Sequence, residues 1–199
     1  GLQLRSHRFD SVLSLHIMKV LVTGASGFIG FHLSRKLINM GWIVYGIDNM
    51  NDYYDVELKK ARLSILNKSN NFYFKEEDII NISNCYHDVD FDLIINLAAQ
   101  AGVRLPVDKY KNYISSNIDG FLNVMNFALL RGCKKVIYAS SSSVYGDAKI
   151  PFSEKDNAFK PKSFYGYSKL LNEKIANEFY QNHDISSIGL RFFTVYGEY

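Results

Sequence analysis

A glycine-rich segment near the amino terminus constrains this chain more than any other feature. A short apolar run, Val20-Leu21-Val22-Thr23, enters Gly24-Ala25-Ser26-Gly27-Phe28-Ile29-Gly30 and then a helical pattern, which predicts a strand, a tight turn and a helix. Gly24 suits the turn, Gly27 suits backbone lying against a diphosphate, and Gly30 lets the helix pack closely. Amides at the helix start favour anionic oxygen. The segment therefore predicts a dinucleotide site, although its Gly-x-x-Gly-x-x-Gly spacing differs from the older Gly-x-Gly-x-x-Gly fingerprint.

Length and composition suit one globular domain. The chain has 199 residues, of which 47% are hydrophobic and 22% charged, enough for a sizeable core. A net charge of +3 with scattered basic residues gives no electrostatic footprint for nucleic acid. The two cysteines and five histidines show no metal-ligand spacing, so we expect no bound metal and a reducing, cytoplasmic compartment. No apolar run approaches the roughly 18 residues of a membrane span, so no membrane contact is expected.

The residues before Met18 are expected to lie outside the domain. Met18 comes directly before the first strand, and the apolar residues upstream are interrupted by Ser14 and His16, unlike the core of a signal peptide. We interpret residues 1–17 as an upstream extension that is disordered or non-native. Residues 18–199 then form one dinucleotide-binding domain.

Apolar runs and helical patterns alternate along that domain. Strands are expected at 20–23, 42–47, 72–74, 93–99, 136–139 and 188–193. Helical patterns are expected at 29–40, 51–63, 112–131 and 164–180. This alternation implies right-handed crossovers and a doubly wound parallel sheet, a Rossmann α/β fold.

Acidic residues follow two of the expected strands. Asp48 stands 18 residues after Gly30, where a carboxylate accepts hydrogen bonds from a ribose diol and repels a 2′-phosphate. No Arg or Lys lies between Asp48 and Lys59 to offset that repulsion, so the sequence favours NAD over NADP. Asp78, after the third strand, is a candidate for contact with the adenine edge. The alternative for Asp48 is an ordinary loop acid after a strand.

A tyrosine and a lysine on the last helix are candidate catalytic groups. Tyr165 and Lys169 lie four residues apart and so share a helix face. A nearby ammonium stabilises a phenolate, so the pair can supply a base near neutral pH. Such pairs also arise by chance on exposed helices. Here they follow the glycine turn, Asp48 and a serine run, residues 140–143, at the carboxyl end of the fifth strand, where ligands of open α/β sheets bind.

With these residues assembled, the chain from Met18 to Gly197 resembles the extended short-chain dehydrogenase/reductase family. Within it the chain resembles the NAD-dependent nucleotide-sugar epimerases and dehydratases, most closely the UDP-glucuronate 4-epimerase branch. The segments that carry the resemblance are 22–30, 47–49, 51–59, 97–104, 140–146 and 191–197. The first and fifth mark the wider family, whereas the segments beginning at Asn51 and Leu97 match the glucuronate branch.

The resemblance implies roles for individual residues. Tyr165 would be the base, Lys169 would hold the nicotinamide ribose, and Ser141 would share the proton of the sugar hydroxyl. The NAD contacts implied are Gly24, Gly27, Phe28, Ile29, Gly30, Asp48, Asn49, Asp78, Ile79, Leu97, Ala98, Ala99, Asn117, Ser140, Tyr165, Lys169 and Phe192. The substrate contacts implied are Arg104, Ser141, Ser142 and Thr194.

The activity implied is epimerisation of a UDP-sugar at C4, from UDP-glucuronate to UDP-galacturonate. The sugar is oxidised to a 4-keto form, turns over and is reduced on its opposite face. Another epimerase, or a dehydratase or decarboxylase of the same family, is the nearest alternative. Dehydratases place an acid one or two residues before Val144-Tyr145-Gly146, where this chain has Ser142 and Ser143. A catalytically silent NAD-binding module is the remaining alternative.

The chain departs from the branch at two sites and ends early. Leu105 follows Arg104 where the branch has an aromatic residue, and Gly166-Tyr167 is bulkier than the usual pair between base and lysine. The proteins it resembles continue past Gly197 with Gly-Pro-x-x-Arg-Pro and a lobe that clamps uridine diphosphate. We therefore expect that the substrate lobe is missing and that this chain binds NAD weakly or moderately and turns over no UDP-sugar. The full-length protein is expected to be a homodimer.

Overall fold

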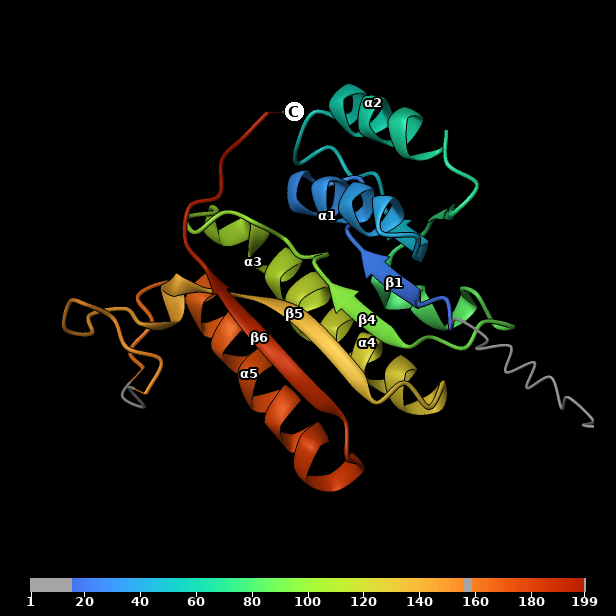
Figure 1. Ribbon diagram of the computed structural model, residues 1–199. Coiled ribbons are helices and arrows are strands. Elements are labelled where there is room, and N and C mark those ends of the chain that lie inside the picture. Colours follow the sequence, from blue (N-terminus) through green and yellow to red (C-terminus); the bar gives the residue numbers. More distant parts are fainter. Residues whose placement is uncertain (1–15, 156–158, 199) are drawn as a thin grey trace, which may run out of the picture.

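A parallel sheet forms the centre of the computed structural model, which describes residues 16–155 and 159–198 (Figure 1). Six strands lie in the order β3-β2-β1-β4-β5-β6. They are β1 (Lys19–Thr23), β2 (Ile43–Asp48), β3 (Phe72–Glu76), β4 (Leu93–Asn96), β5 (Lys135–Ser141) and β6 (Ser186–Phe192). The strand order reverses between β1 and β4, as in doubly wound folds. The predicted Rossmann fold is confirmed, whereas the expectation for residues 1–15 lies outside the described residues.

Helices cover both faces of the sheet (Figure 1). The longer ones are α1 (Phe28–Asn39), α2 (Val56–Leu66), α4 (Gly120–Leu130) and α5 (Phe164–His183). A short α3 (Tyr110–Asn112) and a π-helical η3 (Tyr113–Asp119) run directly into α4, so the helix predicted at 112–131 is built from three pieces. Short 3₁₀ segments are η1 (Ile79–Asn84), η2 (Val107–Lys109) and η4 (Ser142–Val144).

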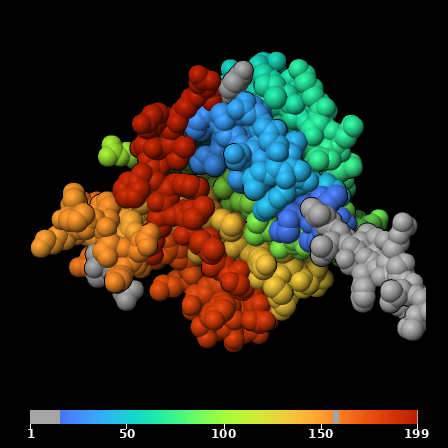
Figure 2. Space-filling model, in the orientation of Figure 1, coloured from blue at the N-terminus to red at the C-terminus, as the bar shows by residue number. Residues whose placement is uncertain are grey.

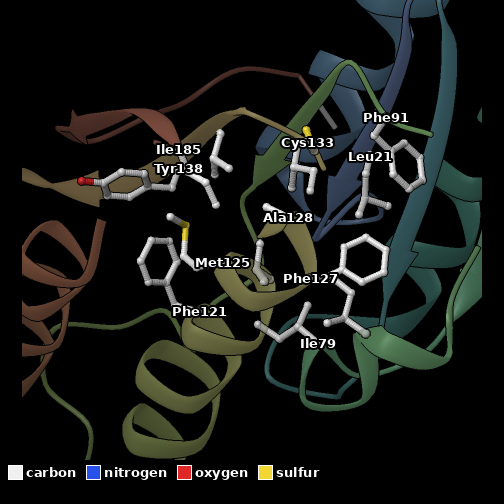
Figure 3. Packing of buried hydrophobic residues seen from close by; sticks show 14 of the residues in the cluster. Leu21, Ile79, Phe91, Phe121, Met125, Phe127, Ala128, Cys133, Tyr138 and Ile185 are labelled. Carbon is white, nitrogen blue, oxygen red and sulfur yellow. The ribbon is translucent and has the colours of Figure 1, made fainter. Parts of the chain in front are cut away.

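Two apolar clusters attach the helices to the sheet. Successive residues of β1 point to opposite faces, so Leu21 belongs to one cluster and Val20 and Val22 to the other. This explains the nearly continuous apolar run of a central strand. On the face of α1 and α2 the cluster includes Phe31, Leu37, Val44, Leu63, Leu66 and Phe72. On the face of α4 and α5 it includes Phe121, Met125, Phe127, Ala128, Tyr138 and Ile185 (Figure 3).

The segment after β2 differs from its prediction. Residues 51–55 are a loop rather than the start of a helix. The Asp55 side chain accepts a hydrogen bond from the backbone N–H of Glu57, so it caps α2, which begins at Val56. This loop brings the Tyr53 hydroxyl beside Gly102, on the segment after β4.

Two strand boundaries also move. The strand predicted at 93–99 ends at Asn96, and the chain beyond it forms a loop with little regular structure up to Pro106. By contrast β5 continues to Ser141, because it pairs with β6 up to the Ser141–Phe192 register. Ser140 and Ser141 are therefore held on a strand rather than on a loop.

Three findings limit the chemistry of the described residues. In residues 16–155 and 159–198 no helix combines the length and apolar character needed to cross a membrane. Over the same ranges, no three His, Cys, Asp or Glu side chains gather in a way that could hold a metal ion. Cys85 and Cys133 are buried, unpaired thiols. Burial raises the pKa of both and so disfavours the reactive thiolate.

Candidate active site

A cleft of about 770 Å³ lies along the carboxyl ends of the strands. Its walls come from the segments that follow all six strands and from α5, around the point where the strand order reverses. Ligands of open α/β sheets bind at this point. The volume falls within the range of about 300–1,000 Å³ that is common for small-molecule sites.

The glycine turn after β1 lines the cleft and permits no larger residues at two positions. Gly24 has φ +70°, and a Cβ there would lie 2.8 Å from the backbone nitrogen of Ala98. A Cβ on Gly30 would lie 2.0 Å from the carbonyl oxygen of Gly24. The helix thus packs against the turn itself. The hydrogen bond from Phe31 N–H to the Gly27 carbonyl, 2.9 Å long, closes the first turn of α1, and the Gly27 N–H donates to the Gly24 carbonyl at 3.0 Å. Phe28, Ile29 and Gly30, whose N–H groups come before the first helical hydrogen bond, line the cleft. This cradle fits the diphosphate of a dinucleotide.

Asp48 is buried at one end of the cleft, with 6% of its surface exposed. One carboxylate oxygen accepts from the Met50 N–H at 2.9 Å, and the other accepts from the Ser26 N–H at 3.2 Å. Nearby, the Asn49 amide donates to the Asp78 carboxylate at 2.7 Å. The predicted ribose and adenine residues therefore share one end of the cleft, which we call the adenosine end.

The structure corrects the premise that no cation lies near Asp48. The Lys59 ammonium is 3.3 Å from an Asp48 carboxylate oxygen, and both side chains are 6% exposed. Lys59 is eleven residues from Asp48 in sequence, but it lies in the first turn of α2, which returns over the end of β2. The eleven-residue separation could have indicated this contact, because the helix that follows a strand in this fold runs back beside that strand.

Tyr165, Lys169 and Ser141 meet at the other end of the cleft, which we call the catalytic end. Tyr165 and Lys169 share a face of α5, as predicted. The Lys169 ammonium donates to the Ala139 carbonyl at 2.8 Å and lies 5.9 Å from the centre of the Tyr165 ring. Lys169 is 3% exposed, and burial lowers its pKa to about 8.

The pKa of Tyr165 differs from the prediction. Burial raises it, and interactions with nearby tyrosines, Tyr54 foremost, add to the rise, whereas a hydrogen bond with the Ser141 side chain lowers it. The net shift is upward, not toward neutral pH. The reason is that the Lys169 ammonium is directed at a backbone carbonyl, so it does not offset the cost of burying a phenolate.

Most of the residues predicted to contact cofactor or substrate line the cleft. They are Gly24, Gly27, Phe28, Ile29, Gly30, Asp48, Asn49, Asp78, Ile79, Leu97, Ala98, Ala99, Ser140, Ser141, Ser142, Tyr165, Lys169, Phe192 and Thr194. Thr194 belongs to residues 193–198, which lie beside α1 (Figure 2). There the Glu198 carbonyl accepts from the His32 ring at 2.8 Å.

Asn117 and Arg104 are not among the cleft-lining residues. Asn117 is 1% exposed, and its side chain accepts from the Gln100 N–H at 2.7 Å and donates to the Gln100 carbonyl at 3.2 Å. These two hydrogen bonds therefore fix the backbone of Gln100 in the loop after β4. Arg104 lies exposed on that loop. A ligand contact for either residue stays a prediction.

Two segments that resemble the glucuronate branch contact each other across the cleft. Gly102 has φ +93°, and a Cβ there would lie 2.2 Å from the Tyr53 hydroxyl. The Gly102 carbonyl accepts from the hydroxyl of Tyr113, whose ring lies 6.0 Å from that of Tyr165. Tyr53 and Tyr54 line the cleft, although neither was predicted as a site residue. The resemblance singled out both segments but gave no sign that they meet.

Gly166-Tyr167, the pair that is bulkier than usual for the branch, does not obstruct the catalytic end. A Cβ on Gly166 would lie 2.8 Å from the Ser143 carbonyl oxygen, so glycine is required for α5 to approach that loop. The Tyr167 side chain is 58% exposed and is not among the residues that line the cleft.

Comparison with known proteins assigns the chain to a family. Residues 20–199 match the NAD dependent epimerase/dehydratase family. The chain belongs to this family. It is 45% identical to Protein CapI of Staphylococcus aureus over 184 residues, which are 90% of this chain and 55% of that protein. It is also 45% identical to UDP-glucuronate 4-epimerase 4 of Arabidopsis thaliana over 187 residues, 89% of this chain and 42% of that protein.

A solved structure of the family superposes closely. UDP-glucuronic acid 4-epimerase of Bacillus cereus, in complex with UDP-glucuronic acid and NAD, has a TM-score of 0.83 and 37% identity. The match covers 90% of this chain and 58% of that one. The chain thus spans about half the length of the relatives it matches. The family is NAD dependent, which confirms the predicted cofactor.

Proposed function

We propose that the complete protein interconverts UDP-glucuronate and UDP-galacturonate by epimerisation at C4. The observation that carries the proposal is the convergence of Tyr165, Ser141 and Lys169 at one end of a cleft whose other parts form a dinucleotide cradle. The resemblance of residues 51–59 and 97–104 to the glucuronate branch supports the choice of sugar, as do the relatives named UDP-glucuronate 4-epimerase.

In this proposal the protein residues move one proton and hold the reacting groups. Tyr165 takes the proton of the C4 hydroxyl, with the Ser141 hydroxyl as its hydrogen-bond partner. Lys169, anchored on the Ala139 carbonyl, holds the nicotinamide ribose beside them. NAD, when bound, supplies a reversible acceptor for the two electrons of the C4–H bond. Tyr165 returns the proton once the 4-keto sugar has turned over, so the reaction is an isomerisation with no net redox change.

The placement of carboxylates favours epimerisation over dehydration. The acidic residues that line the cleft are Asp48, Asp55, Glu77 and Asp78. Asp48 ends β2 and the other three follow β2 or β3, on the opposite side of the sheet from β5 and β6. The positions where dehydratases carry an acid are Ser142 and Ser143, and both line the catalytic end. Elimination of water needs a second acid–base group, and no carboxylate is among the described residues that line the catalytic end. Glu173, which accepts from Ser140, is not a lining residue and is paired with Arg191.

The setting of the reaction follows from the same proposal. The substrate is a soluble nucleotide sugar, and the two buried thiols suit a reducing cytoplasm. We propose that the complete protein acts there as a homodimer. The 199-residue chain itself is expected to turn over no UDP-sugar, because binding energy from the remote nucleotide orients the reacting carbon.

Incubation of the complete protein with a panel of UDP-sugars, followed by chromatography, tests the proposal. UDP-galacturonate should form from UDP-glucuronate, and the Tyr165→Phe variant should be the inactive control. Release of carbon dioxide with a UDP-pentose product would favour a decarboxylase, and turnover of UDP-glucose alone would favour a different epimerase. NAD binding without turnover of any sugar would favour the silent module.

A further inference from the structure

We infer that Lys59 sets how strongly this protein discriminates between NAD and NADP. Asp48 alone would repel a 2′-phosphate, and the geometry assigns Lys59 to weaken that repulsion. The inference concerns the dinucleotide site only, and it holds whether the sugar substrate is a glucuronate or another hexose.

The Lys59 ammonium is held between two acceptors at the adenosine end. It lies 3.3 Å from an Asp48 carboxylate oxygen and 3.5 Å from the side-chain oxygen of Asn51. An ammonium has three N–H donors. Lys59 lines the cleft, so the third donor is available to a group bound there. A ribose hydroxyl and a phosphate oxygen can each accept it.

The Asp48 carboxylate is largely occupied by the protein itself. One oxygen accepts from Met50 N–H and Lys59, and the other accepts from Ser26 N–H. A carboxylate offers about four acceptor sites, so about one remains for a ribose hydroxyl. A 2′-substituent would therefore meet an ion pair with one open acceptor and one open donor, not a bare carboxylate.

A second cation lies close to this ion pair. Arg62 is 5% exposed and also lines the cleft, with its guanidinium donating to the Ser26 carbonyl at 3.2 Å. Two cations, Lys59 and Arg62, thus act on Asp48, while the other acidic residues that line the cleft are Asp55, Glu77 and Asp78. Asp78 lies beyond Asn49, to which it is hydrogen-bonded. In a buried setting with an effective dielectric constant of about 20, one unit of charge a few ångströms from a phosphate changes its affinity by roughly tenfold or more.

A charge cycle at the two positions tests the inference by calorimetry with NAD and NADP. The wild-type protein should bind NAD more tightly. Lys59→Gln should widen the ratio of NADP to NAD dissociation constants by about tenfold or more, because the carboxylate loses its partner. Lys59→Arg keeps the charge and should leave the ratio within about threefold of wild type. All differences should shrink as salt is raised.

A second pair of variants covers the case in which Lys59→Gln does not fold because Asp48 is left buried without a partner. Asp48→Asn should tighten NADP relative to NAD, and adding Lys59→Gln to Asp48→Asn should reverse that gain by about tenfold. Identical ratios in the single and double variants would overturn the inference, as would a Lys59→Gln ratio within twofold of wild type. NAD binding serves as the internal control, so a failed sugar assay has no bearing on the outcome.

Discussion

The two ends of the cleft each contain a buried lysine, and the protein compensates for its charge differently at each end. Lys59 and Lys169 are 5% and 3% exposed. Lys59 faces the Asp48 carboxylate at 3.3 Å, whereas Lys169 faces the backbone carbonyl of Ala139 at 2.8 Å. An opposite charge compensates for burial at the adenosine end. At the catalytic end the compensation is a pKa lowered to about 8.

The contrast shows that a charge partner holds one lysine, whereas the other lysine lies in a setting that shifts pKa values. At the adenosine end two opposite charges hold each other in place, which suits a part of the site that anchors a resident cofactor. At the catalytic end a lysine with a pKa of about 8 lies beside Tyr165, whose pKa is raised by burial. Residues with shifted pKa values therefore meet at the catalytic end, as is common at functional sites.

The largest effect is expected from Tyr165→Phe in the complete protein. The ring stays in place against Tyr113, but the proton acceptor is lost, so epimerisation should fall by about 10²- to 10⁴-fold. Affinity for NAD should change little, because the adenosine end is untouched. Product chromatography and calorimetry on the same preparation measure both quantities. Near-normal turnover would mean that another group is the base.

The next largest effect is expected on stability when Lys59 is replaced. Lys59→Met leaves Asp48 buried without its partner and should lower the free energy of unfolding by about 3–5 kcal/mol. Lys59→Arg is the matched control that keeps the ion pair. Denaturant unfolding of the three proteins measures the difference. Equal stability of Lys59→Met and wild type would show that the pair makes no net contribution and would remove the contrast between the two ends.

Replacement of Lys169 should have a smaller effect on stability, and in the opposite direction. Its folded-state pKa of about 8 lies below the ordinary value of 10.5, so between these pH values the unfolded chain binds more protons and wild-type stability rises with pH. Lys169→Met lacks this group. The variant should be the more stable protein at pH 7, and its advantage should decline from about pH 8 upward. Thermal melts of both proteins across this range test the sign, and a difference independent of pH would contradict it.

The smallest effect concerns the hydrogen bond between Ser141 and Tyr165. Because this bond lowers the pKa of Tyr165, Ser141→Ala should raise that pKa further. The rising limb of kcat/KM with pH should then move to higher pH in the complete protein. Ser141→Thr, which keeps a hydroxyl, should leave the limb near its wild-type position. A shift toward acid in Ser141→Ala would exclude the assigned contact.

Local patterns in the sequence were sufficient for the architecture. The apolar runs predicted a doubly wound parallel sheet, and the glycine turn predicted the dinucleotide cradle. The four-residue spacing of Tyr165 and Lys169 predicted that they share a helix face. Each of these depends on residues that are close in sequence, where backbone sterics and the periods of helix and strand dictate which side chains share a surface. The position of Gly24 in a turn with positive φ follows from the same local rules.

Contacts between distant segments were decided only by the tertiary structure. From the sequence alone, no cation was expected to offset the charge of Asp48, nothing linked Asn117 to Gln100, and the pKa of Tyr165 was expected to be lowered. In the fold, α2 returns Lys59 to Asp48, Asn117 turns inward to hold Gln100, and burial outweighs Lys169 at Tyr165. Sequence spacing does not report these outcomes. Electrostatic and hydrogen-bond energies depend on separation in space and on exposure to water, and packing of the whole sheet determines both.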